Sequence, residues 1–221
     1  MHPLDPVVTL EGRLVTMRPV SRDDYPVLFR WRSSFDVPHY MNFRRRVASY
    51  EEAVRELESV LPNAILLLIR KKSNLEPIGY AMAHTVNPWD GWAAGGVHID
   101  ERYRLRGPGG EAGLLFTDFL FRVYPIRKLM TEIYEFADRV LQMAHAMGFE
   151  EVAYIPDHYW YDDRLWGLHQ MSLTREAWTR TRERFAGIID VQREFAKREP
   201  IGSPASATVV EPAISRDGRS S

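Results

Sequence analysis

Hydrophobic and polar residues change their spacing along the first third of the chain, and this spacing predicts a strand, two helices and another strand. The segment RLVTMRPV (13–20) alternates between apolar and polar positions, which is typical of a strand. Helices are predicted at 21–33 and 49–61, because each segment starts with a serine cap followed by acidic residues. The apolar run AILLLIRKK (64–72) predicts a short buried strand.

The rest of the chain adds strands and helices in a mixed order. NPWDGW (87–92) places an Asp-Gly pair between two strand-like segments, which predicts a hairpin. Gly148 follows a helical segment and is expected to end it. The further elements predicted are strands at 76–86, 93–100, 128–136, 149–155 and 159–173, and helices from the glycine-rich loop to Pro125, at 138–147 and from 174 to about 197. This order predicts an α/β fold with a mixed sheet of about seven strands flanked by helices.

The pattern also divides the chain into segments. We predict an N-terminal lead at 1–12, one compact domain at 13–180 and a C-terminal helical extension at 181–199. Residues 200–221 are rich in Ser, Pro, Ala and Gly and show no periodicity, so we expect a disordered tail. The apolar residues of the last predicted helix suggest packing on the domain or on a second copy, which gives the expectation of a homodimer.

Composition and charge narrow the classes of function. The net charge is −1, so no basic field points to a nucleic-acid partner, and the densest basic patch is FRRRV at 43–47. The chain has no cysteine, which excludes disulfides, thiolate zinc sites and a cysteine nucleophile. The histidines are scattered without metal-ligand spacing, so we expect no metal. No segment resembles a secretion signal or a membrane helix, so we expect a cytoplasmic protein with no membrane partner.

The segment ERYRLRGPGGEAG (101–113) places four glycines between a predicted strand and a predicted helix. Gly107 before Pro108 is typical of a helix cap followed by proline at the first helical position. The first N–H groups of a helix lack partners, so this turn could bind a phosphate through the N–H groups of Gly107, Gly109 and Gly110. A plain structural turn is the alternative. The sequence is neither a P-loop nor a dinucleotide fingerprint, because the required lysine and third glycine are missing.

The segment from Arg104 to Gly109 resembles the pyrophosphate loop of the GNAT superfamily of acyl-CoA N-acyltransferases. Further segments resemble the branch that contains the ribosomal-protein N-terminal acetyltransferases, and they follow in the same order: GRLVTMRPVSRDDYPVLFRWR, PIGYAMAH, RYRLRGPGGEA, MGFEEV and REAW. The resemblance covers about residues 11–180. It implies a curved sheet that splays open beside the glycine loop.

The resemblance also implies a cofactor site and a reaction. Acetyl-CoA or another acyl-CoA would lie in the splay and would pass its acyl group to an amine acceptor by direct attack. The residues expected to bind it are Val97, His98 and Ile99 on the preceding strand, then Arg104, Arg106, Gly107, Pro108, Gly109, Gly110 and Glu111. Two further hypotheses are a CoA-binding domain that has lost catalysis and a biosynthetic enzyme that uses a longer acyl chain.

The chain departs from the family at three positions that often carry functional side chains. The usual glutamate, asparagine and tyrosine correspond here to Ala94, Ala137 and Ala144. His98 falls on the same face of its strand as Ala94 and is the first candidate for the general base. The weaker candidates, on strands that line the same splay, are His84, Asp90, Glu132 and Tyr134, of which the last two share one face of their strand.

Aromatic residues are dense around the expected acceptor side. Trp89, Trp92 and Trp160 are candidates for substrate binding, and cross-strand packing is the alternative explanation for them. The α-amino group of a peptide has a pKa near about 7.7–8, against about 10.4 for a lysine side chain, so it needs less help to lose its proton. The missing glutamate and tyrosine therefore agree with a low-pKa amine or with a base from elsewhere.

Overall fold

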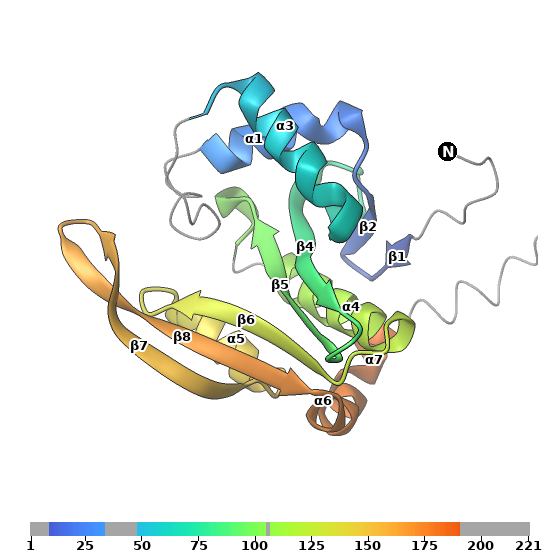
Figure 1. The fold of residues 1–221 in the computed structure, drawn as a ribbon. Helices are drawn as coiled ribbons and strands as arrows, with labels where there is room; N and C mark the ends of the chain where they lie inside the picture. The colour runs from blue at the N-terminus through green and yellow to red at the C-terminus, as the bar shows by residue number, and fades with distance from the viewer. Residues whose placement is uncertain (1–8, 34–47, 105–106, 191–221) are drawn as a thin grey trace, which may run out of the picture.

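The computed structural model describes residues 9–33, 48–104 and 107–190 and contains one eight-stranded sheet in these residues (Figure 1). The strand order is β1-β2-β3-β4-β5-β6-β8-β7, and every neighbouring pair is antiparallel except β5 and β6, which are parallel. The strands are β1 (Leu10–Glu11), β2 (Val15–Pro19), β3 (Ile65–Lys71), β4 (Pro77–Asn87), β5 (Trp92–Ile99), β6 (Lys128–Tyr134), β7 (Glu150–Tyr161) and β8 (Arg164–Thr174). The predicted mixed α/β fold is confirmed.

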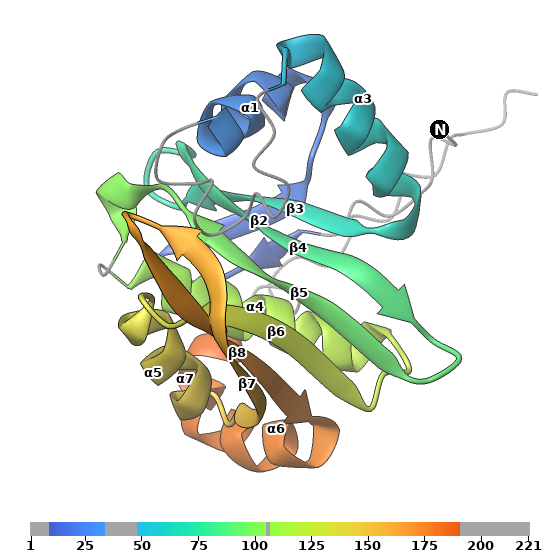
Figure 2. The same cartoon turned by 60° about the vertical axis from the view of Figure 1, so that its left-hand side comes forward.

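Helices cover both faces of the sheet (Figures 1 and 2). On one face, α1 (Tyr25–Ser33) and α3 (Tyr50–Val60) pack over β3 and β4. On the other face lie α4 (Pro108–Val123), α5 (Asp138–Ala146), α6 (Arg175–Arg182) and α7 (Ala186–Ile189). The sheet therefore has an α1 face and an α4 face, and these names are kept below.

Local signals set several helix ends as predicted. The Ser49 hydroxyl accepts the Glu52 N–H (3.2 Å), and the Glu52 carboxylate accepts the Ser49 N–H (3.0 Å), which is a complete capping box. Gly107 is the N-cap of α4 with φ of 99°, and Pro108 is the first helical residue. Gly148 has φ of 91° just after α5, a conformation that glycine adopts at little cost.

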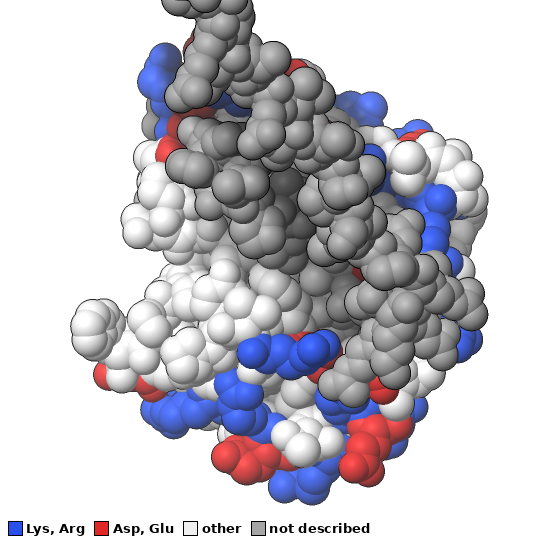
Figure 3. Space-filling view, turned by 90° about the vertical axis from the view of Figure 1, so that its right-hand side faces the viewer, with Lys and Arg blue, Asp and Glu red and all other residues white. Residues whose placement is uncertain are grey.

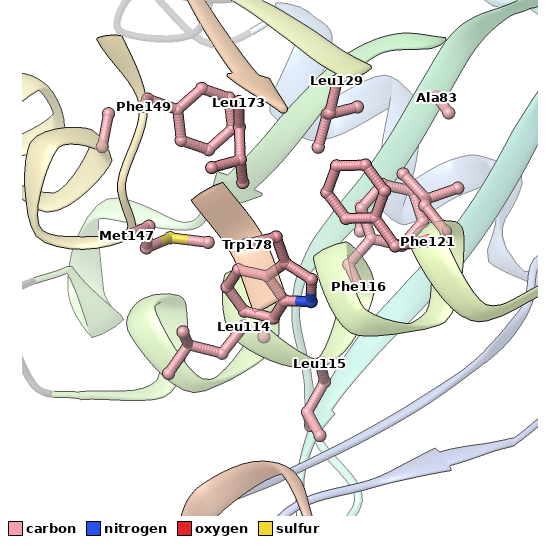
Figure 4. Packing of buried hydrophobic residues seen from close by; sticks show 14 of the residues in the cluster. Ala83, Leu114, Leu115, Phe116, Phe121, Leu129, Met147, Phe149, Leu173 and Trp178 are labelled. Atoms are coloured by element: carbon pink, nitrogen blue, oxygen red, sulfur yellow. The ribbon is translucent and has the colours of Figure 1, made fainter. Parts of the chain in front are cut away.

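The main core lies between the α4 face of the sheet and the helices that cover it (Figure 4). Phe116 and Phe121 of α4 pack with Leu129 of β6, Leu173 of β8 and Trp178 of α6, and all five are almost fully buried. A second cluster fills the α1 face and consists of Tyr25, Leu28, Trp31, Leu66, Leu68 and Tyr80. Burial of these side chains, each worth about 1.5–3 kcal/mol, is the main force that holds both helix layers on the sheet.

One predicted strand is wrong. The segment 159–173 is not a single strand, because Asp162 and Asp163 turn the chain between β7 and β8. Their φ angles are 51° and 58°, the left-handed conformations of a type I′ hairpin turn, which aspartate tolerates better than most residues. The aromatic and apolar residues on both sides of the turn hid this signal in the sequence.

Replacing Asp163 by glycine is expected to stabilise the protein slightly. Glycine adopts positive φ without the steric cost that a side chain adds, and Asp-Gly is a preferred pair for this turn. We expect a gain of about 0.5 kcal/mol in the free energy of unfolding, measured by urea denaturation. Asp157→Gly is the comparison variant. Asp157 also has a positive φ, of 51°, but it lies in the irregular part of β7 and not in a two-residue hairpin turn.

The predicted C-terminal helix begins at Thr174 as expected, but it is not continuous. It is divided into α6, a 3-10 turn at Glu183–Phe185 and α7, and residues beyond Asp190 lie outside the described part. The break lets Ile189 reach the core, while the Asp190 carboxylate turns back to accept a bond from Arg182 (2.6 Å). Four apolar residues of this segment pack on the domain itself: Trp178, Phe185, Ile188 and Ile189.

Figure 3 shows one face of the molecule, coloured by charge. On the face in Figure 3, basic and acidic side chains lie interspersed. The basic segment 43–47 falls outside the described residues. Within the described ranges, no helix has the length and apolar character needed to cross a bilayer.

Candidate functional site

The first turn of α4 presents backbone donors that the helix does not use. The Glu111 N–H bonds to the Gly107 carbonyl (3.1 Å) and is the first to close a helical turn. The N–H groups of Gly107, Gly109 and Gly110 precede it and have no acceptor within the helix, while Pro108 has no N–H. With the partial positive charge of the helix end, these three donors form a site suited to an anion.

Close packing also favours glycine in this turn. A Cβ atom on Gly109 would lie 3.1 Å from Cγ1 of Ile99 at the end of β5, and one on Gly110 would lie 3.0 Å from Cε of Met143 on α5. Gly109 is thus where the helix start touches the last residue of β5. These glycines therefore pack closely on neighbouring side chains, and the N–H groups of Gly107, Gly109 and Gly110 have no acceptor within the helix.

The parallel strands β5 and β6 pair only over their first residues. Their register runs from Trp92–Lys128 to Ala94–Met130, whereas β5 continues to Ile99 and β6 to Tyr134. Figure 1 shows the two strands diverging from this point. The splay that the family resemblance implied is therefore present, and α4 begins beside its open end.

Backbone groups of β5 point into this splay. The Asp100 N–H donates to the Ile78 carbonyl of β4 (2.9 Å), and partners alternate along an antiparallel pair. The N–H and C=O of His98 therefore point to β4, and those of Val97 and Ile99 point the other way, towards β6. Of the three β5 residues predicted to bind a cofactor, Val97 and Ile99 have the required backbone direction, and His98 does not.

Asp100 fixes the loop that follows β5. Its carboxylate accepts Nε1–H of Trp31 on α1 (2.9 Å) and both Nε–H and Nη2–H of Arg102 (3.1 and 3.0 Å). These bonds, led by the one from Arg102, hold the pKa of Asp100 well below its usual range. Arg104 donates from Nε to the Ile99 carbonyl (3.0 Å), so it stays against the end of β5, and Arg106 lies outside the described residues.

Glu111 has a different role from the one predicted. Its buried carboxylate accepts the N–H groups of Arg13 (2.8 Å), Leu14 (2.7 Å) and Val15 (2.8 Å). Its own N–H is used within the helix, so Glu111 has no donor to offer a phosphate. It instead ties the start of β2 to the first turn of α4.

His98 lies inside the second core cluster. Its side chain is 4% exposed, and its ring centroid is 5.1 Å from that of Tyr80 and 5.9 Å from that of Trp31. Burial, helped by the positive charge of Arg104, lowers the pKa of His98 to about 4. Its Nε2 atom is buried without a hydrogen-bond partner. The imidazole is therefore neutral at physiological pH and screened from solvent.

Glu132 and Tyr134 share the α1 face of β6, as predicted, but their environments differ. Glu132 is exposed and accepts a bond from Gln170 of β8 (3.1 Å). Tyr134 is buried, with its ring centroid 4.4 Å from that of Tyr159. Of the two, Glu132 has the more accessible titrating group.

The three candidate tryptophans do not come together. Trp89 is 95% exposed at the hairpin turn, and Trp92 lies beside Lys128 at the start of β6. Trp160 is 53% exposed and pairs with Leu165, beyond the opposite end of β6. Asp90, another candidate, accepts a bond from Asn87 (2.8 Å) and so helps to form the hairpin turn.

Three alanines stand at positions where the family often has functional side chains. Ala137 and Ala144 are buried at α5 on the α4 face, and Ala94 lies at the last paired position of β5. Among the described residues, no three His, Asp or Glu side chains converge as metal ligands would. His84 lies at an irregularity in the pairing of β4 with β5, between Ala83 and Thr85, which no sequence pattern shows.

The chain belongs to the GNAT acetyltransferase family. A family model described as "Acetyltransferase (GNAT) domain" matches residues 14–150, which is more than half of the chain. A comparison with curated proteins finds no match.

Solved structures of similar fold agree with this assignment. A spermidine N-acetyltransferase from Vibrio cholerae, in complex with CoA and spermine, has a TM-score of 0.69 at 13% identity and covers 75% of this chain and 98% of its own. A GCN5-related N-acetyltransferase from Brucella melitensis has a TM-score of 0.63 at 18% identity, with coverages of 82% and 85%. RimL, a ribosomal alpha-N-protein acetyltransferase, has a TM-score of 0.63 at 13% identity, with coverages of 79% and 98%.

Proposed function

We propose that this protein transfers an acyl group, in the simplest case acetyl, from acyl-CoA to a primary amine of a small molecule or of a peptide N-terminus. The observation that carries the proposal is that the first N–H groups of α4 meet the edge of β5 that does not pair with β4; on that edge the Ile99 carbonyl also accepts a bond from Arg104. The N–H groups of Gly107, Gly109 and Gly110 begin α4 beside Ile99, and Val97 and Ile99 point into the splay of β5 and β6. The Vibrio cholerae structure with bound CoA supports a CoA-type co-substrate.

Each set of groups would bind a different part of the co-substrate. The diphosphate, with two close negative charges, suits the helix N-terminus and the side chain of Arg104. The amide-containing arm suits the strand-like edge of Val97 and Ile99, because a chain with N–H and C=O groups can pair there as a short strand would. In this arrangement the thioester end points back along β5 towards Ala94, where the strands part.

The reaction needs no covalent intermediate on the protein. A neutral amine attacks the thioester carbonyl, and the CoA thiolate leaves and takes up a proton. The amine classes supported by similar folds are a polyamine and a protein α-amino group. A catalytically degenerate CoA-binding domain would have the same backbone groups at the start of α4 and on β5, but it would not turn over acyl-CoA.

Replacing Gly109 by valine is expected to weaken acetyl-CoA binding by about 100-fold, measured by titration calorimetry. The branched side chain would hold the diphosphate away from at least two backbone donors, each worth about 1.5 kcal/mol for a charged acceptor. Gly113→Val is the matched control, one turn further into α4, where a Cβ atom has its nearest neighbour at 3.8 Å. Unchanged affinity in folded Gly109→Val would refute the assignment of this site.

Turnover is measured separately as CoA thiol release from acetyl-CoA with spermine and with trialanine. Release with either amine establishes an N-acetyltransferase. Calorimetric binding of acetyl-CoA without release by either amine would favour the degenerate CoA-binding domain instead.

A further inference from the structure

The edge of β4 that faces β5 contains a β-bulge at His84. Ala83 pairs with Gly95, and the next registered pair is Thr85 with Ala94, so His84 and Thr85 together oppose the single residue Ala94. Ala83 is buried in the core on the α4 face, and Val86 packs against the same core. His84 and Thr85 between them therefore both belong to the α1 face, and Nδ1 of His84 lies 3.1 Å from the Thr85 hydroxyl.

This bulge lies where β5 and β6 part. Ala94, opposite the bulge, is also the last residue of β5 that pairs with β6, through Met130. Two positions further along β6 on the same face stands Glu132, whose charge acts on the His84 ring. The Ala94 side chain is only a methyl group, so it fills less of the space opposite the bulge than a glutamate would and obstructs the His84 imidazole less.

His84 differs from His98 in access. His84 is exposed, whereas His98 is 4% exposed and packed between Trp31 and Tyr80. A group that takes a proton from a substrate must also return it to solvent in every cycle, and only an accessible imidazole does so without moving the core. The α1 face of the described sheet thus holds one buried and one accessible histidine near the splay.

We propose that His84 is the residue that accepts the proton from the amine, and that the bulge in β4 places the imidazole in front of Ala94. This proposal rests on the proposed acyl transfer. In the neutral tautomer with its proton on Nδ1, the ring donates to the Thr85 hydroxyl and keeps the lone pair of Nε2 for the substrate.

The protons and bonds balance as follows. An alkylammonium substrate gives one proton to Nε2 of His84, which releases it to solvent. The neutral nitrogen then attacks the thioester carbonyl, the C–N bond forms and the C–S bond breaks. The second proton leaves the nitrogen and ends on the thiolate sulfur. The products are the amide, the thiol of CoA and one proton in solvent.

The pH dependence follows from the environment of the ring. Packing around the imidazole lowers the pKa of His84 below its ordinary value, and the negative charge of Glu132 offsets part of this effect. Among the described residues, Glu132 is the charged side chain with a resolved effect on His84. His84 must be neutral to act, so kcat/KM rises with pH through its pKa. Removing the charge of Glu132 lowers that pKa and moves the rise to lower pH.

The test measures kcat/KM from pH 5 to 10 with acetyl-CoA, using spermine and trialanine as acceptors. For His84→Gln we expect a loss of about 100-fold or more at neutral pH with spermine, and recovery as the pH approaches the pKa of the amine itself. The loss with trialanine is smaller, because an α-amino group sheds its proton more easily. Glu132→Gln shifts the acid limb to lower pH, and added imidazole restores activity to His84→Ala.

The control is His145→Gln, an exposed histidine on α5 at the α4 face, which should keep the wild-type profile. An active wild type whose His84→Gln variant keeps most of its rate and the same pH profile would overturn the role of His84 and leave the proposed function intact. Loss of the acid limb in His98→Gln instead would transfer the role to His98. Absence of turnover in the wild type, with acetyl-CoA bound, would overturn the proposed function and this inference together.

Discussion

Replacing Glu111 by alanine should lower the free energy of unfolding by at least about 3 kcal/mol. The buried carboxylate accepts three backbone N–H groups, from Arg13, Leu14 and Val15, and hydrogen bonds to charged groups contribute about 1.5–3 kcal/mol each. Water that enters the vacated space would form hydrogen bonds with these N–H groups and so would recover part of the lost free energy. A loss of this size is a large fraction of the roughly 5–15 kcal/mol that stabilises a typical domain. Urea denaturation followed by circular dichroism measures it.

Two further variants test the reason for this loss. A Cβ atom on Gly12 would be closer to Oε2 of Glu111 than the sum of the two van der Waals radii, so Gly12→Ala should destabilise the protein with Glu111 still present. Glu58→Ala is the control, because Glu58 forms an exposed ion pair with Arg22 and its removal should cost less than about 1 kcal/mol. If Glu111→Ala unfolds no more easily than Glu58→Ala, the carboxylate does not hold β2 to α4.

The second large effect concerns Asp118, which anchors the C-terminal helices. Its carboxylate, 4% exposed, accepts Nε–H of Arg182 (2.7 Å) and lies 3.4 Å from Nε1 of Trp178. The pKa of Arg182 is raised well above its usual range, first by Asp118 and then by Asp190. Asp118→Ala is expected to lower the free energy of unfolding by about 3 kcal/mol, because it leaves a partly buried guanidinium and an indole N–H without this acceptor.

A double variant separates this cost from the value of the ion pair. Asp118→Leu combined with Arg182→Met replaces the pair by apolar side chains and should be more stable than Asp118→Ala alone. The same urea titration measures all three proteins. Equal stability of wild type and Asp118→Ala would show that this carboxylate does not hold α6, which keeps the bonds of Arg175 to the carbonyls of Phe121 and Ile126.

Local sequence signals were enough for most of the fold. The capping box at Ser49 and Glu52, the Gly107-Pro108 start of α4 and the glycine at 148 act within a few residues of themselves, so the sequence shows them directly. The glycine loop was also visible, because a helix N-terminus after a strand has the same unused donors in any fold. By contrast, Asp162 and Asp163 turn the chain within a continuous aromatic pattern, and that pattern concealed them.

By itself, then, the sequence determined the mixed α/β fold, the splay with its glycine turn, and the likeness to GNAT enzymes, since these depend on local conformation and on ordered motifs. Tertiary structure alone decided which side chains are accessible there. Glu111 was predicted to bind CoA, but its partners are separated from it by up to 98 positions. His98 was predicted to be an accessible base, but in the structure its ring packs against Trp31 and Tyr80. His84 gains its place only from the register of β4 on β5, because a bulge is defined by the partner strand and not by the strand that contains it.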